Sequence, residues 1–210
     1  MYAQLQEPTT MNKNFIGIAG LIGVGKSTLT EKLAEALGYK AFFEPVSSNP
    51  YLAEFYKEPE KFSFEMQIYF LSERFRQHQE LIWAEGGGVQ DRTIYEDSVF
   101  AKSLLEKGLL SPRSYETYTK LFSIMSNFLA IPTIIIFLKA HPEVCLERIR
   151  RRSRSQEVGI SLEYLETLEK HYGELMEKLG KLTTVIELDW TEFQDTQDVV
   201  RLCEPHLNNR

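Results

Sequence analysis

The residues best suited to chemistry form a glycine-rich run near the start of the chain. Gly20, Gly25, Lys26 and Ser27 match the pattern G-x-x-x-x-G-K-[ST]. Glycines let the backbone N–H groups of such a loop turn towards a polyphosphate, and the partial positive charge at a helix N-terminus favours the same ligand. The lysine of this pattern reaches the β- and γ-phosphates, and the serine is a ligand of Mg²⁺. The run therefore predicts a nucleoside triphosphate site but does not identify the acceptor.

The segments on either side supply the context that this loop needs. An apolar run over 15–19 reads as a buried strand, and a helical pattern over 26–37 follows it. A glycine-rich turn that binds nothing is the alternative, and the flanking strand and helix make it the weaker interpretation. The residues predicted to bind ATP in the loop are Gly20, Leu21, Ile22, Gly23, Val24, Gly25, Lys26, Ser27 and Thr28.

Strands and helices alternate along the rest of the chain. Strands are predicted over 15–19, 40–44, 89–91, 133–139 and 183–188. Helices are predicted over 26–37, 62–84, 93–107, 113–130, 142–152 and 162–178, with a short closing helix over 195–203. Such alternation predicts an α/β fold, with a parallel sheet of about five strands and helices on both faces. Ligands in these sheets bind beyond the carboxyl ends of the strands.

Two acidic residues are predicted to lie at that edge. Glu44 closes one strand, and it is suited to accept the proton of an attacking hydroxyl or to hold Mg²⁺ through water. Asp91 closes another strand, where an acid in this fold class lies near the metal, and Arg92 follows it. Arg92 is suited to stabilise a transferred phosphoryl group or to hold Glu44. A solvated turn residue and a structural Asp–Arg pair are the alternatives.

A glutamine and an arginine share one face of the predicted helix 62–84. Gln67 and Arg74 are seven residues apart, which brings them to the same side of a helix about 10 Å from each other. A glutamine amide both donates and accepts, so it can pair with the edge of adenine or of cytosine. The alternative is an amphipathic helix whose polar residues face water.

Five arginines crowd the end of the predicted helix 142–152 and the segment after it. Arg148 and Arg152 are four residues apart on one face, and Arg154 follows. Beside a phosphate-binding loop, this cluster predicts a lid over about 148–158 that closes on ATP. A solvated helix end and a nucleic-acid patch are the alternatives, and a net charge of −6 disfavours the second.

Composition limits the class of protein. The 210 residues suit a single domain, predicted over 13–210, after a flexible extension over 1–12. No apolar stretch approaches the roughly 20 residues of a membrane span. Two cysteines are too few for a disulfide framework, which favours a reducing, cytoplasm-like compartment. We expect neither a membrane nor a nucleic-acid polymer as a partner.

Five ordered motifs together resemble the deoxynucleoside kinase family, from about residue 14 to about residue 178. The resembling segments are the glycine loop 20–28, the Glu-Pro pair at 44–45, the stretch 56–67 continuing to Arg74, the stretch 91–97, and the arginine-rich segment. The resemblance implies a P-loop kinase fold, ATP as the phosphoryl donor, Mg²⁺ as the cofactor and a homodimer. The helices over 93–107 and 113–130 are the implied contact between the subunits.

The resemblance also implies a role for each matching residue. Glu44 looks like the base for the 5′-hydroxyl, with Asp91 as the alternative base or metal support. Tyr56 and Glu157 are implied to bind the sugar 3′-hydroxyl. Gln67, Arg74 and Asp97 are implied to lie at the edge of the base, and Phe100 is implied to stack on its face. Lys26, Arg92 and the lid arginines are implied to stabilise the transferred charge.

The sequence defines the nucleobase of the substrate less well than it defines the reaction. Arg74 paired with Asp97 favours deoxyadenosine, with deoxyguanosine or deoxycytidine as secondary substrates. A nucleoside monophosphate kinase similar to thymidylate kinase is the nearest enzyme alternative, although it needs further cations for the acceptor's phosphate. A P-loop scaffold without activity is the non-enzymatic alternative. A regulatory GTPase is disfavoured because no Asn-Lys-x-Asp follows the loop.

Overall fold

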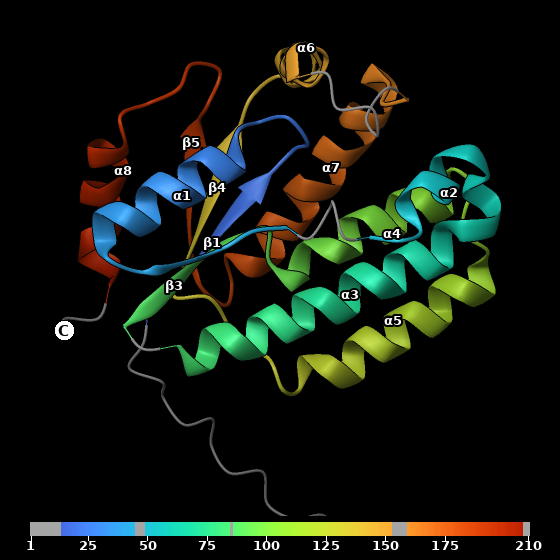
Figure 1. Cartoon of the computed structure of the whole chain (residues 1–210), viewed down its shortest axis with the longest axis horizontal. Coiled ribbons are helices and arrows are strands. Elements are labelled where there is room, and N and C mark those ends of the chain that lie inside the picture. The colour runs from blue at the N-terminus through green and yellow to red at the C-terminus, as the bar shows by residue number, and fades with distance from the viewer. Residues whose placement is uncertain (1–13, 45–48, 85, 153–158, 208–210) are drawn as a thin grey trace, which may run out of the picture.

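Five parallel strands form the centre of the computed structural model, which describes residues 14–44, 49–84, 86–152 and 159–207 (Figure 1). The strand order is β2-β3-β1-β4-β5. The strands are β1 (Asn14–Gly20), β2 (Lys40–Phe42), β3 (Gly87–Asp91), β4 (Ile134–Lys139) and β5 (Thr184–Asp189). The predicted five-stranded parallel sheet is thus confirmed. The expected extension over 1–12, with Arg154 and Glu157, lies outside the described residues.

Eight α-helices and two 3₁₀ turns, η1 and η3, surround the sheet in the described residues. The α-helices are α1 (Lys26–Leu37), α2 (Leu52–Lys57), α3 (Pro59–Trp83), α4 (Asp97–Glu106), α5 (Pro112–Ser126), α6 (Pro142–Arg152), α7 (Leu162–Leu179) and α8 (Thr196–Cys203). The 3₁₀ turns are η1 (Ile94–Glu96) and η3 (Glu204–His206). No helix in the described part of the chain is long and apolar enough to cross a membrane.

Helices cover both faces of the sheet, as the sequence predicts. α1 and α8 lie together on one side, whereas α3, α4 and α7 lie on the other, and α5 runs along the outside of α3 (Figure 1). The central strands β1 and β4 are apolar and almost fully buried. Their burial between two helical layers is what a nearly continuous apolar run in a parallel strand indicates.

Four parts of the chain differ from the sequence prediction. Strand β2 ends at Phe42, so Glu44 lies two residues beyond the strand. The helix expected over 93–107 is instead the turn η1 followed by α4, because Thr93 and Glu96 close a capping box that tightens the chain before Asp97. Helix α2 was not expected, and α3 begins at Pro59, since proline is favoured in the first turn of a helix.

Candidate active site

The glycine loop joins β1 to the N-terminus of α1 and needs its glycines for conformation. Gly20 and Gly25 adopt φ values of 142° and 112°, where side-chain-bearing residues are strained. A Cβ atom at Gly20 would lie 2.7 Å from the backbone oxygen of Leu138 on β4. Gly25 is the N-cap of α1, and no side chain caps that end. The helix N-terminus therefore offers its backbone N–H groups to an anion.

Lys26 is buried within this loop. Its Nζ donates to the backbone oxygens of Gly20 at 3.0 Å and Leu21 at 2.9 Å. Burial and, to a lesser extent, the nearby Arg92 lower the pKa of Lys26 to about 8, against the opposing effect of Asp91 and Glu44. The loop thus holds an ammonium group whose charge depends on pH near neutrality.

Ser27 and Asp91 meet at the carboxyl end of the sheet. The hydroxyl of Ser27 donates to Oδ2 of Asp91 at 2.5 Å. The other carboxylate oxygen of Asp91 is buried and has no hydrogen-bond partner among the described residues. Oxygen donors of this kind are the ones that Mg²⁺ prefers, so the residues present fit this cation.

Glu44 lies between two arginines. Its Oε1 accepts from Nη2 of Arg74 at 2.5 Å and from Nη1 of Arg92 at 3.4 Å. Burial acts to raise the pKa of Glu44, but Arg92 and Arg74 outweigh it and hold this pKa at about 2. The carboxylate is therefore ionised at every physiological pH and able to accept a hydrogen bond.

Arg92 has an unusual backbone conformation at the end of β3. It is the one described non-glycine residue with a positive φ, 65°, a conformation that costs about 1–3 kcal/mol. Its backbone N–H donates to Ile18 on β1, and its guanidinium lies 4.4 Å from the ring centre of Phe100. The turn directs the side chain towards Glu44 rather than along the strand. Arg92 contacts Glu44 through a single hydrogen bond, from Nη1 to Oε1.

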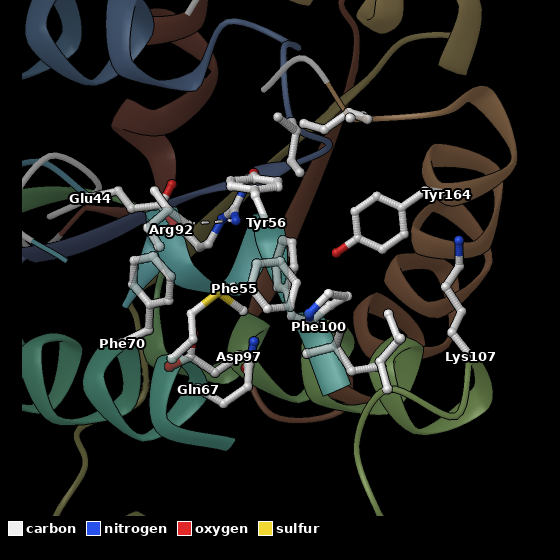
Figure 2. Close-up of a pocket in the computed structure, with 18 of the residues that line it drawn as sticks. Glu44, Phe55, Tyr56, Gln67, Phe70, Arg92, Asp97, Phe100, Lys107 and Tyr164 are labelled. Carbon is white, nitrogen blue, oxygen red and sulfur yellow. Dashed lines mark hydrogen bonds and ion pairs between the residues drawn. The ribbon is translucent and has the colours of Figure 1, made fainter. Parts of the chain in front are cut away.

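A cavity of about 310 Å³ opens beside Glu44 and Arg92. Glu44 and Arg92 line one end, Lys107 and Tyr164 line the other, and Gln67 and Asp97 lie at its floor (Figure 2). Its walls are mainly apolar with a few convergent polar groups, which is typical of a site for a small organic molecule. Further lining residues are Ile22, Leu52, Phe55, Tyr56, Pro59, Met66, Phe70, Arg74, Phe100, Leu104, Leu109, Gly159 and Ile160.

Gln67 and Arg74 both face this cavity from α3, as their spacing predicts. Arg74 is fully buried and donates from Nη1 to Oδ1 of Asp97 at 2.6 Å. The second oxygen of Asp97 is buried without a hydrogen-bond partner among the described residues. Burial raises the pKa of Asp97 to about 7, against the opposing effect of Arg74. The cavity floor therefore combines an amide, a guanidinium and a carboxyl group.

Aromatic rings form the walls around this polar floor. Phe100 lines the cavity from α4, and the half-exposed Tyr56 lines it from α2, with Phe55 in edge-to-face contact with Tyr56 at 5.4 Å. Tyr164 of α7 turns its hydroxyl towards the centre of the cavity (Figure 2). The space between these rings suits a flat, partly polar molecule.

The arginine cluster divides into different environments. Arg148 donates to the backbone oxygens of Val24 and Trp190, at 3.1 and 3.0 Å, and its guanidinium lies 4.2 Å from the ring centre of Phe193. It thus joins the glycine loop to the segment after β5. Arg152 is exposed at the end of α6, and Arg154 lies outside the described residues. Lid closure by this cluster stays a prediction.

Several cavity residues were not expected from the sequence. Helix α2 contributes Leu52 and Phe55, and the opposite wall contains Lys107, Ile160 and Tyr164. Ile160 and Tyr164 lie in the segment 159–165, which continues the resemblance to the family after the arginines, but the resemblance implied no role for either residue. The others are ordinary helix and loop residues until tertiary packing turns them towards the cavity.

A phosphate-binding loop beside a separate, largely apolar acceptor cavity defines a phosphotransferase of the P-loop class. The deoxynucleoside kinase family model matches residues 16–206. The chain belongs to the deoxynucleoside kinase family, and it is an ATP-dependent phosphotransferase that acts on deoxynucleosides. The geometry described above is therefore that of a two-substrate site.

Relatives with known activities cover most of the chain. The deoxyadenosine kinase of Dictyostelium discoideum is 49% identical over 189 residues, which are 90% of this chain and 77% of that protein. The deoxyadenosine/deoxycytidine kinase of Bacillus subtilis is 43% identical over 80% of this chain and 79% of its own length. The structure of the M. mycoides deoxyadenosine kinase with dCMP and dCDP has a TM-score of 0.81, with 33% identity over 92% of this chain and 98% of that one.

Proposed function

We propose that this enzyme transfers the γ-phosphoryl group of ATP to the 5′-hydroxyl of deoxyadenosine, and that Glu44 accepts the hydroxyl proton. The observation that carries this proposal is the position of Glu44, ionised at the end of the acceptor cavity nearest the glycine loop. A carboxylate there accepts a hydrogen bond from the 5′-hydroxyl and receives its proton as the new P–O bond forms. In the same in-line step the bond between the γ-phosphorus and the β,γ-bridging oxygen breaks, and ADP leaves.

Cationic groups next to Glu44 stabilise the transferred charge. Lys26 exchanges its two backbone contacts for contacts with the β- and γ-phosphates. Arg92 lies close enough to Glu44 to contact the phosphoryl group during its transfer. The lid arginines, including Arg148 and Arg152, join the ATP phosphates when the site closes. Positioning and charge stabilisation account for most of the catalysis in this class of reaction.

Ser27 and Asp91 are the proposed protein contacts of Mg²⁺. Their oxygens already lie 2.5 Å apart, and one oxygen of Asp91 is unpartnered among the described residues. When bound, Mg²⁺ neutralises charge on the β- and γ-phosphates of ATP. Because Asp91 is the last residue of β3, the strand holds its carboxylate beside Ser27.

The acceptor cavity accounts for recognition of the nucleoside. Gln67, Arg74 and Asp97 are the proposed contacts of the base edge, and Phe100 is proposed to stack on its face. Tyr56, with Glu157, is proposed to bind the 3′-hydroxyl, and a tyrosine at the sugar edge disfavours a 2′-hydroxyl. The free oxygen of Asp97 suits the exocyclic amino group of adenine, and the named relatives agree with an amino-bearing base.

A substrate panel tests the proposal directly. Initial rates with ATP and Mg²⁺ are measured for deoxyadenosine, deoxyguanosine, deoxycytidine and thymidine, with dAMP and adenosine as further acceptors. We expect the highest kcat/KM with deoxyadenosine, weaker activity with the other amino-bearing bases, and little with adenosine. Thymidine as the best acceptor would overturn the base assignment, and faster phosphorylation of dAMP than of deoxyadenosine would overturn the acceptor assignment.

We further propose that two copies of the enzyme associate through α5. Leu121 and Ile124 of α5, and Phe128 just after its end, recur at helical spacing and are exposed, whereas Val99, Ala101 and Leu104 of α4 are buried. The earlier expectation that both helices pair between subunits therefore narrows to α5. Ile124→Glu is expected to yield monomers by size-exclusion chromatography with light scattering. Leu202→Glu, an exposed apolar site on α8, is the matched control and is expected to leave dimers intact.

A reducing compartment such as the cytoplasm is the proposed location. The two cysteines, Cys145 and Cys203, are free and buried, and burial raises the pKa of each thiol to about 11. Thiols in this state are unreactive and form no disulfide. Fractionation of cells followed by activity assay tests the location.

A further inference from the structure

Glu96 is a buried acid that none of the proposed roles uses. It ends the turn η1 and is completely inaccessible to solvent. Its Oε1 accepts from the backbone N–H of Thr93 at 2.9 Å, and its Oε2 accepts from the hydroxyl of Tyr172 at 2.8 Å. A carboxylate that is buried this fully is costly unless its oxygens are satisfied and a positive charge is near.

The positive charge near Glu96 is Arg92. Nε of Arg92 lies 3.9 Å from Oε2 of Glu96, the oxygen that also receives the hydroxyl of Tyr172. Among the described residues, the other ion pair of Arg92 is its shorter contact with Glu44, 3.4 Å from Nη1 to Oε1. Arg92 lines the acceptor cavity, whereas Glu96 is not among the residues that line it.

Tyr172 supports Arg92 from a second direction. Its ring meets the ring of Phe100 edge-on, with centres 6.5 Å apart and planes at 89°, and Phe100 is the ring over which Arg92 lies. The other side of Tyr172 stacks on Phe137 of β4, with centres 5.8 Å apart. Tyr172 thus connects both neighbours of Arg92 to the rigid centre of the sheet.

We propose that Glu96 and Tyr172 are positioning residues that hold the Arg92 guanidinium in the orientation needed for phosphoryl transfer. An arginine side chain has several rotatable bonds, and the strained backbone at Arg92 fixes only its first part. The Glu96 carboxylate and the Phe100 ring restrain the remainder, and Tyr172 restrains both of these groups. The inference rests on the proposed role of Arg92.

Tyr172→Phe removes one hydroxyl and keeps both ring contacts. We expect kcat with deoxyadenosine to fall roughly tenfold, the scale on which outer-shell partners act, while KM for the nucleoside stays within about twofold. His171→Gln is the matched control, because His171 is the neighbouring buried residue of α7 and contacts Glu106 of α4 at 2.9 Å, away from Arg92. The control is expected to keep kcat even where its melting temperature falls as much as that of Tyr172→Phe.

A double-mutant cycle separates positioning from general damage. In an Arg92→Lys background, Tyr172→Phe is expected to have little further effect on kcat, because the group that it positions is gone. Equal effects of Tyr172→Phe in both backgrounds, or full kcat in the single variant, would overturn the inference. If Tyr172→Phe proves too unstable to assay, Glu96→Gln keeps the side-chain shape, removes the charge beside Arg92 and enters the same cycle with the same expectation.

The failure of this inference is distinguishable from failure of the proposed function. A wild-type enzyme that phosphorylates deoxyadenosine while Tyr172→Phe is fully active contradicts only the positioning role. A wild-type enzyme that phosphorylates none of the four deoxynucleosides contradicts the proposed function itself.

Discussion

Arg74 and Glu44 form an ion pair with 2.5 Å between Nη2 and Oε1, and it links one end of the acceptor cavity to the cavity floor. The same guanidinium binds Asp97 through Nη1 at 2.6 Å. The planar guanidinium of Arg74 thus joins Glu44, the proposed catalytic base, to Asp97, which is proposed to bind the nucleobase. Because a guanidinium has fixed geometry, a shift of either acid is transmitted to the other.

Removing Arg74 is therefore expected to damage both stability and activity. Arg74→Met leaves the buried Asp97 and the partly buried Glu44 short of a counter-charge, so the free energy of unfolding should fall by about 3–5 kcal/mol. Denaturant unfolding checks this value. Arg76→Met is the control, since Arg76 on the same helix pairs with Glu73 and Glu80 at the surface, where a pair contributes about 0–1 kcal/mol. Equal destabilisation by both variants would contradict the internal role of Arg74.

Glu44→Gln tests the proposed base. The amide keeps the size of the side chain but accepts no proton, so kcat is expected to fall about a hundredfold or more while the fold is retained. Steady-state kinetics with deoxyadenosine measure the change, and circular dichroism checks the fold. Glu58→Gln, an exposed acid paired with Lys61 near the cavity wall, should leave kcat unchanged. Turnover close to the wild-type value would remove Glu44 as the base.

The sheet and the residues at its edge could be predicted from the sequence because they obey local rules. The apolar run of β4 between turn residues, and the glycine pattern before α1, define their elements without tertiary information. The seven-residue spacing of Gln67 and Arg74 likewise predicted that they share one face of α3, and both residues line the cavity. These features depend on periodicity and backbone conformation, which a single chain segment contains.

The rest of the site depends on contacts between distant segments. Helix α2 is six residues long and too short to show a helical period, so Phe55 had no recognisable role. The positions of Tyr172 and Glu96 follow from packing of α7 against η1, which are 76 residues apart in sequence at their hydrogen bond. The positive φ of Arg92 likewise arises from tertiary contacts, since arginine has no intrinsic preference for it.

Ser27→Ala tests the proposed Mg²⁺ contact. Loss of the hydroxyl removes one oxygen donor and the hydrogen bond that orients Asp91, so the Mg²⁺ concentration for half-maximal activity should rise about ten- to a hundredfold. Titration of activity with Mg²⁺ at saturating ATP measures it. Ser103→Ala, a buried hydroxyl on α4, is the control and should leave the Mg²⁺ requirement unchanged. An unchanged requirement in Ser27→Ala would contradict the assignment.

Because the pKa of Lys26 is lowered to about 8, we predict that the enzyme takes up a proton when it binds ATP in mildly alkaline solution. Burial holds the pKa of Lys26 in the free enzyme at about 8, so at pH 8.5 a large part of this side chain is neutral. The negative phosphates of bound ATP favour the ammonium form and raise this pKa, so the complex binds more protons than the free enzyme. Calorimetry at pH 8.5 in two buffers of different ionisation enthalpy measures that uptake, which should be small at pH 7.

The lowered pKa of Lys26 also affects the stability of the fold. As pH rises, this contribution to stability increases, whereas ATP affinity decreases. Between about pH 8 and 10.5 the unfolded chain keeps the Lys26 proton that the folded chain has lost, so the contribution of Lys26 to the free energy of unfolding rises with pH, while ATP affinity falls. Lys26→Arg keeps a charge at all these pH values, so it should abolish both the proton uptake and the pH-dependent change in stability. Uptake of equal size in the wild type and in Lys26→Arg would assign the proton to another group.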